Sequence, residues 1–329
     1  MSYTPAFMLS GGDAPNSSVP LLCPFCGPDG VIAPPLRLSP KESVVLCRAC
    51  GIYQSHPFPD NTAALYQEGY YSRQKSRRFA AVLEWGIRWF RWERAWSLNR
   101  RYRKGRILDV GCGRGLMLHY LSDRFGWEVQ GTQISETAHA YATGVLGVPV
   151  FLGDLLSLPP SRPFDVVSLY HVLEHLTNPS AYLAEINRRL TPNGACLIEV
   201  PNTHSLMARL TKQHWFGWDL PYHTYHFNPN SLKALLEKNG FQVEQVNHWS
   251  GEFNTFGVLQ SFLNTLFSED SYLFHLLQRK ARVREKPGPA LACLFLATVL
   301  APVALVVAAV GAAAGMGEVV RVFARKKSG

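Results

Sequence analysis

Apolar and polar residues alternate along the middle of the chain in a way that predicts strands and helices in turn. Residues 107–110 have the composition of a buried strand, and leucines at helical spacing follow at positions 116, 118 and 121. Further strand-like runs lie at 127–132, 148–152, 164–170 and 195–200, with helical patterns between them. Strands that alternate with helices are typical of an α/β domain with a mostly parallel sheet.

The C-terminal part of the chain has a different pattern. No charged residue occurs between Pro287 and Gly317, and residues 290–314 are numerous enough to cross a lipid bilayer. Arginines and lysines flank this segment on both sides, so the positive-inside rule predicts no orientation. Residues 318–324, beyond the segment, alternate in the manner of a strand.

The N-terminal third is more polar and more basic. Residues 1–20 are rich in Gly, Ser, Pro and Asn and are expected to be disordered. After a connector that begins at residue 57, tryptophans recur at helical spacing with arginines between them, at Trp85, Trp89, Trp92 and Trp96. An aromatic face bordered by arginines is typical of a helix in a membrane interface. A helix that packs on a neighbouring domain, with its arginines in solvent, fits the pattern equally well.

Composition narrows the class of partner. The 329 residues include 33 Lys and Arg against 24 Asp and Glu, a formal net charge of +9 that favours an anionic partner. A membrane surface is the favoured choice, because no recognised nucleic-acid-binding module is present. The first twenty residues have no apolar core of a secretory signal, and the cysteines show no secreted-type spacing. These features together predict a cytosolic compartment.

Four of the seven cysteines form two C-x-x-C pairs, and each pair is followed by a glycine. The pairs are Cys23 with Cys26 and Cys47 with Cys50. Two such knuckles supply the tetrahedral set of four thiolates that zinc prefers, with four thiols and no metal as the alternative. A closed Cys₄ site leaves no open position for a substrate, so we expect a structural zinc in a small ribbon over residues 21–56.

The run Asp-Val-Gly-Cys-Gly-Arg-Gly at 109–115 connects the first strand of the central domain to its first helix. Glycines permit a sharp turn and the close approach of a ligand, towards which the helix also points its first N–H groups. A nicotinamide-binding turn requires G-x-G-x-x-G, and the third glycine here falls one residue early. The run resembles the first motif of the class I S-adenosylmethionine (SAM) methyltransferases. The resemblance implies a Rossmann-like fold with a seven-stranded, mostly parallel sheet and an antiparallel last strand.

The same resemblance implies how the glycine turn holds SAM. Gly111 and Gly113 would pass under the amino-acid end of the cofactor, and Asp109 would order the loop. Cys112 and Gly115 belong to the same loop and are also expected to bind the cofactor. No C-x-x-x-C-x-x-C triplet occurs in the chain, which argues against radical SAM chemistry.

The nucleoside end of SAM would meet the ends of the next strands. Family members usually carry an acidic residue that accepts hydrogen bonds from both ribose hydroxyls, whereas this chain has Gln133, whose amide accepts one bond and donates another. Asp154, followed by Leu155, matches the carboxylate that the family places against the adenine amino group. Tyr170, at the end of the fourth strand, is expected to border the cofactor.

The sequence His-Val-Leu-Glu-His at 171–175 follows the fourth strand. H-x-x-E-H is also a zinc-peptidase signature, but that site needs both histidines on one long helix. The β-rich residues before it and Pro179 after it limit any helix here. The run 164–202, with Trp215 and residues 221–227, resembles the subgroup that includes the ubiquinone-biosynthesis O-methyltransferases. The resemblance covers about residues 105–250.

In that subgroup the residues after the fourth strand lie beside the methyl group. We therefore expect Glu174, His175 and Trp215 to border the substrate. Some members bind a divalent cation at this place, and His171 with Glu174 and His175 could hold a second divalent cation likewise. Transfer to a hydroxyl needs a base, and histidine suits that role near neutral pH. The catalytic candidates are His171, His223 and His226.

The family's sheet ends in an antiparallel strand beside the sixth, and residues 317–325 are expected to form it. Both ends of the apolar segment then lie on one side, which a single membrane span cannot satisfy. Because Pro302 can break a helix, we expect a re-entrant hairpin of helices at 291–301 and 303–314, aided by the weakly apolar residues 253–267. There are two alternatives to this re-entrant hairpin. The segment could form one membrane span with a free basic tail, or a buried hairpin in a soluble dimer.

The expected order of parts is a disordered N-terminus (1–20), a zinc ribbon (21–56), a connector with the basic helix (57–104), a methyltransferase core (105–250), a membrane-associating insertion (251–317), and a last strand with a basic tail (318–329). The expected function is SAM-dependent methylation of an oxygen, less readily a carbon, on a lipophilic or lipid-linked small molecule or sugar. The insertion would place the enzyme at the cytoplasmic face of a membrane. Alternatives are a C-methyltransferase for a soluble nucleotide-sugar, because similar ribbons precede sugar C-methyltransferases, and a non-catalytic, membrane-associated SAM-binding scaffold.

Overall fold

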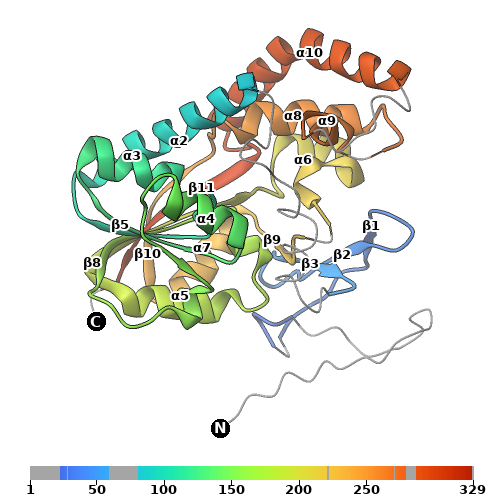
Figure 1. Cartoon of the computed structure of the whole chain (residues 1–329). Helices are drawn as coiled ribbons and strands as arrows, with labels where there is room; N and C mark the ends of the chain where they lie inside the picture. Colours follow the sequence, from blue (N-terminus) through green and yellow to red (C-terminus); the bar gives the residue numbers. More distant parts are fainter. Residues whose placement is uncertain are drawn as a thin grey trace.

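The computed structural model describes residues 23–27, 29–58, 81–220, 222–269, 271–278 and 287–327. The predictions for residues 1–20 and for most of the connector lie outside these described residues. A central twisted sheet carries helices on both faces, the small N-terminal sheet is attached at the right of the view, and the helix α10 (Pro287–Ala313) runs across the top (Figure 1).

The central sheet has seven strands in the order β10-β11-β8-β7-β4-β5-β6. The parallel strands nearest the glycine turn are β4 (Arg106–Val110), β5 (Glu128–Gln133), β6 (Val150–Leu152), β7 (Phe164–Tyr170) and β8 (Leu190–Pro201). Strand β11 (Val319–Lys326) lies between β8 and β10 (Phe241–Asn247) and is antiparallel to both. This arrangement confirms the predicted Rossmann-like fold, with a mostly parallel seven-stranded sheet and one antiparallel strand.

Two apolar layers hold helices against the sheet. On one face, α5 (Pro179–Arg189) and α7 (Pro229–Lys238) pack with the buried side chains of β7, β8 and β10. On the other face, α2 (Ala81–Tyr102) and α3 (Leu116–Phe125) pack on β4 and β5. The helix α4 (Glu136–Gly144) follows β5. The glycine turn therefore emerges between two well-packed layers at the C-terminal end of β4.

The N-terminal sheet extends into the catalytic part of the chain. It contains β1 (Leu36–Arg37), β2 (Ser43–Leu46) and β3 (Tyr53–His56), and the fourth strand of the same sheet is β9 (Tyr225–His226). The pairing of β3 with β9 was not predicted, because a two-residue strand has no periodicity that a sequence pattern could reveal.

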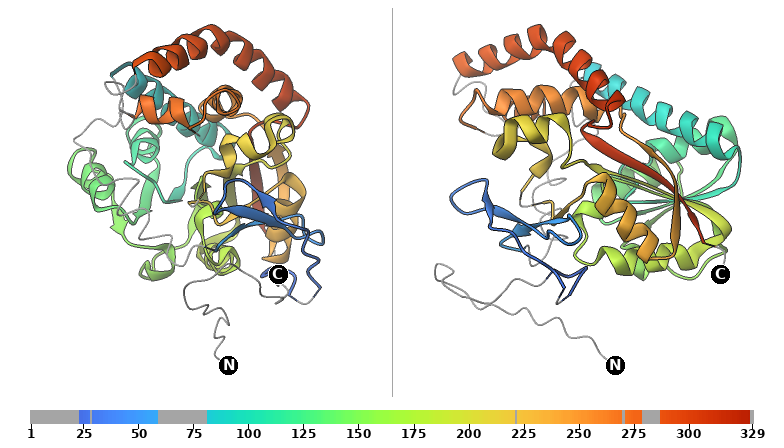
Figure 2. Two further views of the ribbon diagram at one scale, coloured as in Figure 1. Left: turned by 90° about the vertical axis from the view of Figure 1, so that its right-hand side faces the viewer. Right: turned by 180° about the vertical axis from the view of Figure 1, so that it is seen from behind.

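A small helical cap follows β8 and β10. It contains α6 (Leu206–Thr211), the 3₁₀ turns η4 (Lys212–His214) and η5 (Phe216–Trp218), α8 (Phe253–Asn264) and α9 (Tyr272–Leu277). These elements share one apolar cluster with the inner face of α10. Both views of Figure 2 show α10 arching over α8, at the same end of the molecule as α2.

The predicted hairpin is wrong, because α10 is one continuous helix with Pro302 inside it. Proline removes one backbone hydrogen bond, which can bend a helix without ending it when the rest of the helix is packed on a neighbour. The alternative of a single span with a free basic tail is also wrong, because the residues after α10 form β11 inside the sheet.

The two sides of α10 are apolar in different ways. The buried side consists of small residues, namely Ala290, Cys293, Ala297, Ala304, Ala308 and Gly311. The opposite side, here called the outer stripe, consists of large exposed residues, namely Leu291, Phe295, Val299, Val303, Val306 and Val310. A helix that only filled a core would bury its large side chains, so the outer stripe indicates a surface that meets something apolar.

Candidate active site

A cavity of about 910 Å³ opens at the C-terminal ends of β4 and β7. Its walls come from α2, the glycine turn, the end of β7, the segment 215–223 and α8. Strand β4 lies between β7 and β5, at the point where the order of strands reverses. Ligands of open α/β sheets bind at this switch point, so the cavity occupies the place that the fold predicts for a cofactor.

The glycine turn forms the floor of this cavity. Gly111 has φ +67°, and a Cβ atom there would lie 2.7 Å from Cγ2 of Val172. Asp109 is buried beneath the turn, where its Oδ1 accepts a hydrogen bond of 2.7 Å from the Ser168 hydroxyl. Burial raises the pKa of Asp109 to about 6, against the opposing effects of Ser168 and nearby arginines. A cationic group at this place would therefore be well matched to Asp109.

The predicted cofactor residues fall into two groups. Those that line the cavity are Asp109, Gly111, Cys112, Gly113 and Tyr170. Those that are not among its lining residues are Gly115, Gln133, Asp154 and Leu155. Their contacts with SAM stay predictions.

Two members of the second group are engaged in local turns. The Gln133 side chain accepts a 3.0 Å bond from the backbone N–H of Ser135, at the start of α4. Asp154 begins the 3₁₀ turn η2 (Leu155–Ser157), where it accepts a 2.7 Å bond from the Leu156 N–H and another from the Tyr182 hydroxyl. Both side chains therefore stabilise the loops at the strand ends.

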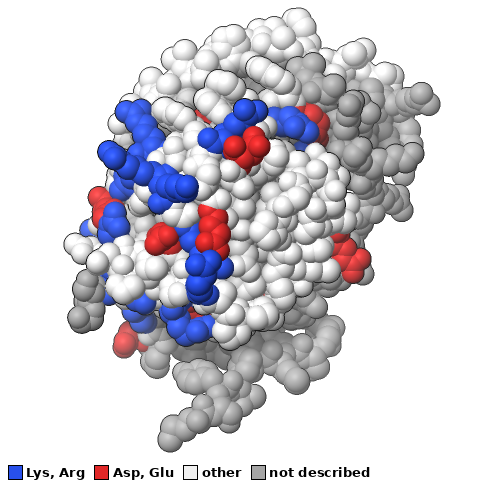
Figure 3. Space-filling view, turned by 60° about the vertical axis from the view of Figure 1, so that its left-hand side comes forward, with Lys and Arg blue, Asp and Glu red and all other residues white. Residues whose placement is uncertain are grey.

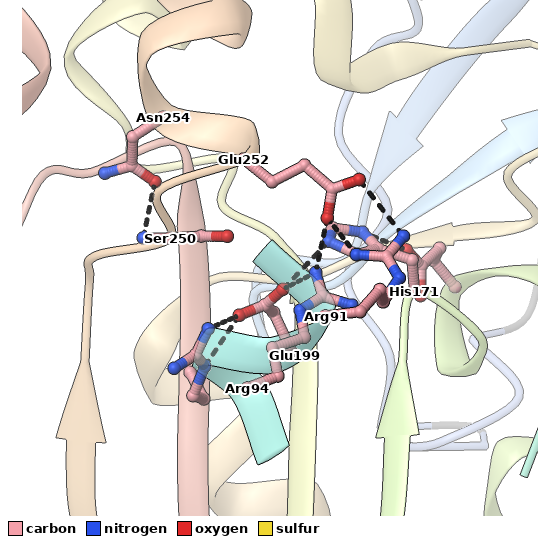
Figure 4. A network of polar contacts seen from close by, with 9 residues as sticks. Arg91, Arg94, His171, Glu199, Ser250, Glu252 and Asn254 are labelled. Carbon is pink, nitrogen blue, oxygen red and sulfur yellow. Dashed lines mark hydrogen bonds and ion pairs between the residues drawn. The ribbon is translucent and has the colours of Figure 1, made fainter. Parts of the chain in front are cut away.

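A buried ionic network links Glu199 and Glu252 with the arginines of α2 (Figure 4). Glu199, fully buried on β8, accepts from Arg94 of α2 at 3.0 Å and from Arg321 of β11 at 2.6 Å. Arg94 and Arg91 also bind Glu252, just before α8. The two arginines pull the pKa of Glu199 far below its usual range although burial opposes them. The network ties α2, the sheet and the cap together around the cavity.

His171 belongs to this network. Its Nδ1 lies 3.2 Å from Glu174 Oε1 and its Nε2 lies 3.2 Å from Glu199 Oε1. Burial alone would lower the pKa of His171, but the two carboxylates raise it. With a glutamate at each ring nitrogen, His171 is placed to hold a positive charge and to position groups around it. It lies between the end of β7 and a short 3₁₀ turn, η3 (Leu173–His175), and not on the long helix that a peptidase site needs.

A second group of polar side chains contains Glu174, His175 and His223. One ligand atom from each lies within 4.8 Å of the others, which is a set that could hold a divalent cation. The Nδ1 of His175 donates to the Tyr222 carbonyl and the Nδ1 of His223 donates to the Gly217 carbonyl, both at 2.9 Å. These bonds place the lone pair of each ring on Nε2.

Burial lowers the pKa of both imidazoles of this group. The value for His175 falls to about 4, with the neighbouring His223 as a second cause, and that of His223 falls below its usual range. Both rings line the cavity, as does Trp215. Glu174 is buried behind them, and its Oε2 has no hydrogen-bond partner among the described residues. The group thus presents neutral imidazoles to the cavity.

His226 lies elsewhere. It is not among the residues that line the cavity, and its Nε2 is 3.1 Å from the Ser55 hydroxyl of the N-terminal sheet. Its ring packs against Trp218 and His223. The structure therefore brings His171, His175 and His223 to the cavity wall and leaves His226 behind it.

Several residues on the cavity wall were not predicted from the sequence. They are Arg91, Arg94, Glu252 and Glu318. Burial raises the pKa of Glu318 to about 7, although its carboxylate accepts a 2.7 Å bond from the Trp215 indole. A usable signal was present at this position, because Glu318 is the first charge after a long uncharged run. The sequence could not single out Arg91 and Arg94, because many other arginines lie in the same basic segment.

The four cysteines of the two C-x-x-C pairs converge. Sγ of Cys23 is 3.6 Å from Sγ of Cys50, and Sγ of Cys47 is 3.9 Å from Sγ of Cys26. Tetrahedral zinc with Zn–S bonds of about 2.3 Å separates its sulfurs by roughly 3.8 Å. A hydrogen bond from Cys50 lowers the pKa of Cys23 to about 5, against the effect of burial. Spacing and chemistry therefore fit a structural zinc ion.

Comparison with known proteins gives matches to the central part of the chain. A family model described as a methyltransferase domain matches residues 90–246. A ubiquinone biosynthesis O-methyltransferase from Paramagnetospirillum magneticum is 31% identical over 163 residues, which cover 46% of this chain and 64% of the relative. A probable S-adenosylmethionine-dependent methyltransferase from Mycolicibacterium smegmatis is 32% identical over 143 residues, covering 43% and 53%. The chain thus spans less than two thirds of the length of these relatives.

A solved structure has the same fold. It is a phosphoethanolamine N-methyltransferase 2 from Haemonchus contortus in complex with phosphomonomethylethanolamine and S-adenosylhomocysteine, with a TM-score of 0.50 and 17% sequence identity. The match covers 84% of this chain and 63% of that chain. At this identity the likeness concerns the fold alone.

Proposed function

We propose that the chain is a SAM-dependent methyltransferase that transfers the methyl group of SAM to a hydroxyl of a lipophilic acceptor, because residues 90–246 match a methyltransferase domain and the relatives carry methyltransferase names. The observation that carries the proposal is a single cavity with a cofactor-binding turn at one end and neutral histidines and aromatic rings at the other. The curated relative named as an O-methyltransferase supports oxygen as the nucleophile.

SAM would lie over the glycine turn. Gly111 and Gly113 leave room for its amino-acid end, and the buried carboxylate of Asp109 is matched to its positive charge. Arg91, on the cavity wall, has both arms of its guanidinium paired with Glu252 and would help to hold the wall beside the cofactor. Gln133 and Asp154 would act by shaping the adenosine-binding loops.

His223 is the base that we propose for removal of the acceptor's proton. A base needs an accessible lone pair, and the bond from Nδ1 to the Gly217 carbonyl leaves that lone pair on Nε2. His171 is less suitable, because both of its nitrogens face carboxylates. The methyl carbon of SAM is already activated by the sulfonium, so alignment and proton removal are the tasks of the protein. A divalent cation held by Glu174, His175 and His223 would instead lower the pKa of a bound hydroxyl.

The acceptor half of the cavity is apolar. Its walls include Phe253, Phe256 and Leu259 from α8, Phe274 from α9 and Phe90 from α2. Such a lining favours an aromatic or lipid-linked acceptor over a free nucleotide-sugar, whose phosphates need several donors.

The acceptor class is testable with labelled SAM. We expect the purified chain to place label in a total lipid extract and not in a soluble metabolite extract. A Gly111→Val variant is the matched control, because its side chain would collide with Val172 and exclude the cofactor. Label in the soluble fraction alone would favour the nucleotide-sugar alternative. Tight binding of S-adenosylhomocysteine without transfer to any extract would favour the non-catalytic scaffold.

The outer stripe of α10 supports attachment to a membrane. The helix has 27 residues, its most apolar window has a mean hydropathy of 2.7, and Phe295 is 68% exposed. Trp85, Trp89 and Trp96 are exposed along α2, and Figure 3 shows an uncharged upper edge with Lys and Arg gathered below it. An apolar edge above basic side chains suits an anionic bilayer. Because both ends of α10 pack on the cap, we propose that it lies flat in the cytoplasmic leaflet.

Flotation with vesicles of phosphatidylcholine and phosphatidylglycerol tests this attachment. We expect the chain to float, and Phe295→Ser with Val299→Ser to weaken partitioning by at least ~10-fold, since each buried side chain of this size contributes roughly 1.5–3 kcal/mol. Leu210→Ser with Val145→Ser is the control, because these apolar residues are equally exposed but lie outside α10. Equal flotation of the two double variants would contradict the proposal.

A further inference from the structure

The N-terminal sheet is continuous with the segment that carries His223. Strand β3 pairs with β9 in an antiparallel register, with Tyr53 opposite His226 and Gln54 opposite Tyr225. The next residue, Ser55, donates its backbone N–H to the Thr224 carbonyl at 3.0 Å. The segment from 223 to 226 therefore extends the ribbon sheet, although Ser55 and His223 are 168 positions apart in the chain.

The side chain of Ser55 makes this junction specific. Ser55 is buried, and its hydroxyl donates to the His223 carbonyl at 2.5 Å and lies 3.1 Å from Nε2 of His226. From the other side, the Thr224 N–H donates to the Glu174 carbonyl at 2.7 Å. The backbone next to His223 is thus held between the ribbon and the turn that follows β7.

Both cysteine knuckles reach the same part of the chain. Phe25, between Cys23 and Cys26, packs its ring 4.9 Å from that of Tyr225. The carbonyl of Gly51, directly after Cys50, accepts a 2.8 Å bond from the Asn228 side chain. These contacts begin at the positions that a bound metal would fix. A ribbon of this size has a small core of its own, so we expect a bound metal to contribute much of its stability.

We propose that the metal-bound ribbon positions the catalytic segment, with Ser55 as the positioning residue that holds 223–226 in register so that His223 faces the acceptor. The proposal rests on the proposed function only for the role of His223. Loss of the metal would release this segment while leaving the glycine turn intact, because β4 and its neighbours form a separate sheet. Occupancy of the Cys₄ site would then control methyl transfer and spare cofactor binding.

Hydrogen exchange of the full zinc-loaded chain tests the coupling without using activity. In Ser55→Ala, we expect amides in 222–226 to exchange at least ~10-fold faster, because the buried His223 carbonyl loses its donor and the His226 ring loses its hydroxyl partner. Zinc content and affinity for S-adenosylhomocysteine should match the parent. Ser55→Thr, which keeps the hydroxyl, should restore slow exchange. Ser43→Ala is the matched control, since the Ser43 hydroxyl donates within the ribbon sheet, to the His56 carbonyl.

Removal of zinc by a chelator should accelerate exchange of the same amides, with S-adenosylhomocysteine still bound. Unchanged exchange in 222–226 after zinc removal, or in Ser55→Ala, would overturn the coupling. If these amides exchange faster but the protein methylates no acceptor, the coupling between ribbon and segment 223–226 is supported and the proposed function is not. The coupling and the proposed function can therefore fail separately. Where an acceptor is methylated, Ser55→Ala should lower kcat with little change in the KM for SAM.

Discussion

Replacing His223 by asparagine is expected to lower kcat by at least ~100-fold while affinity for S-adenosylhomocysteine stays within about twofold. Asparagine can still donate to the Gly217 carbonyl, as Nδ1 of the histidine does, but offers no basic Nε2. The cofactor end of the cavity is built from other elements, so binding should persist. Initial rates and calorimetric titration measure the two effects. His204→Asn, at an exposed position away from the cavity, is the control.

The dependence of kcat on pH is a second test of His223 as the base. Burial lowers the pKa of His223, so its neutral form persists to lower pH than that of an exposed histidine. Only the neutral form can accept a proton, so kcat should rise with pH through a value below about 6.5 and then level off. In His223→Asn this limb should vanish. Retention of both the rate and the limb would remove His223 from the mechanism.

Replacing Glu199 by glutamine is expected to destabilise the fold by roughly 3–5 kcal/mol. The substitution leaves the buried guanidinium groups of Arg94 and Arg321 without their shared carboxylate. Urea unfolding measures the loss. Glu244→Gln is the matched control, because Glu244 also faces two arginines but is partly exposed, and such pairs contribute only about 0–1 kcal/mol. Equal losses in both variants would contradict the importance of burial.

The sign of the pH dependence follows from the same network. The folded-state pKa of Glu199 is lowered, so its contribution to stability is complete above the usual glutamate range and is lost as pH falls through and below that range. The difference in unfolding free energy between the parent and Glu199→Gln should therefore shrink on acidification. A difference that grew at low pH would mean that the carboxylate does not act as an ion.

Local patterns in the sequence were sufficient for most of the fold. Buried strands such as 164–170 are apolar runs of the length of a strand. The glycine turn identified the strand before it as the first strand of the central domain. The last strand was also predictable, because residues after the apolar segment alternate. The hairpin failed for a physical reason: a proline within a helix that is supported along its length bends the helix and does not end it.

The site was less predictable, because its parts come from distant elements. The motifs identified Asp109 and the histidines, but no pattern indicates that Arg94 of α2 would meet Glu199 of β8. The sequence also could not distinguish His223, at the cavity wall, from His226, which lies three residues later and behind the wall. Such distinctions depend on tertiary packing, which spacing along the chain does not encode.

Strand β11 also has a consequence for biosynthesis. It fills the gap between β8 and β10, yet it follows α10 in the chain. On the ribosome, the outer stripe of α10 emerges before the strand that closes the sheet. If the outer stripe binds lipid as proposed, the order of synthesis places this anchor ahead of the strand that completes the sheet.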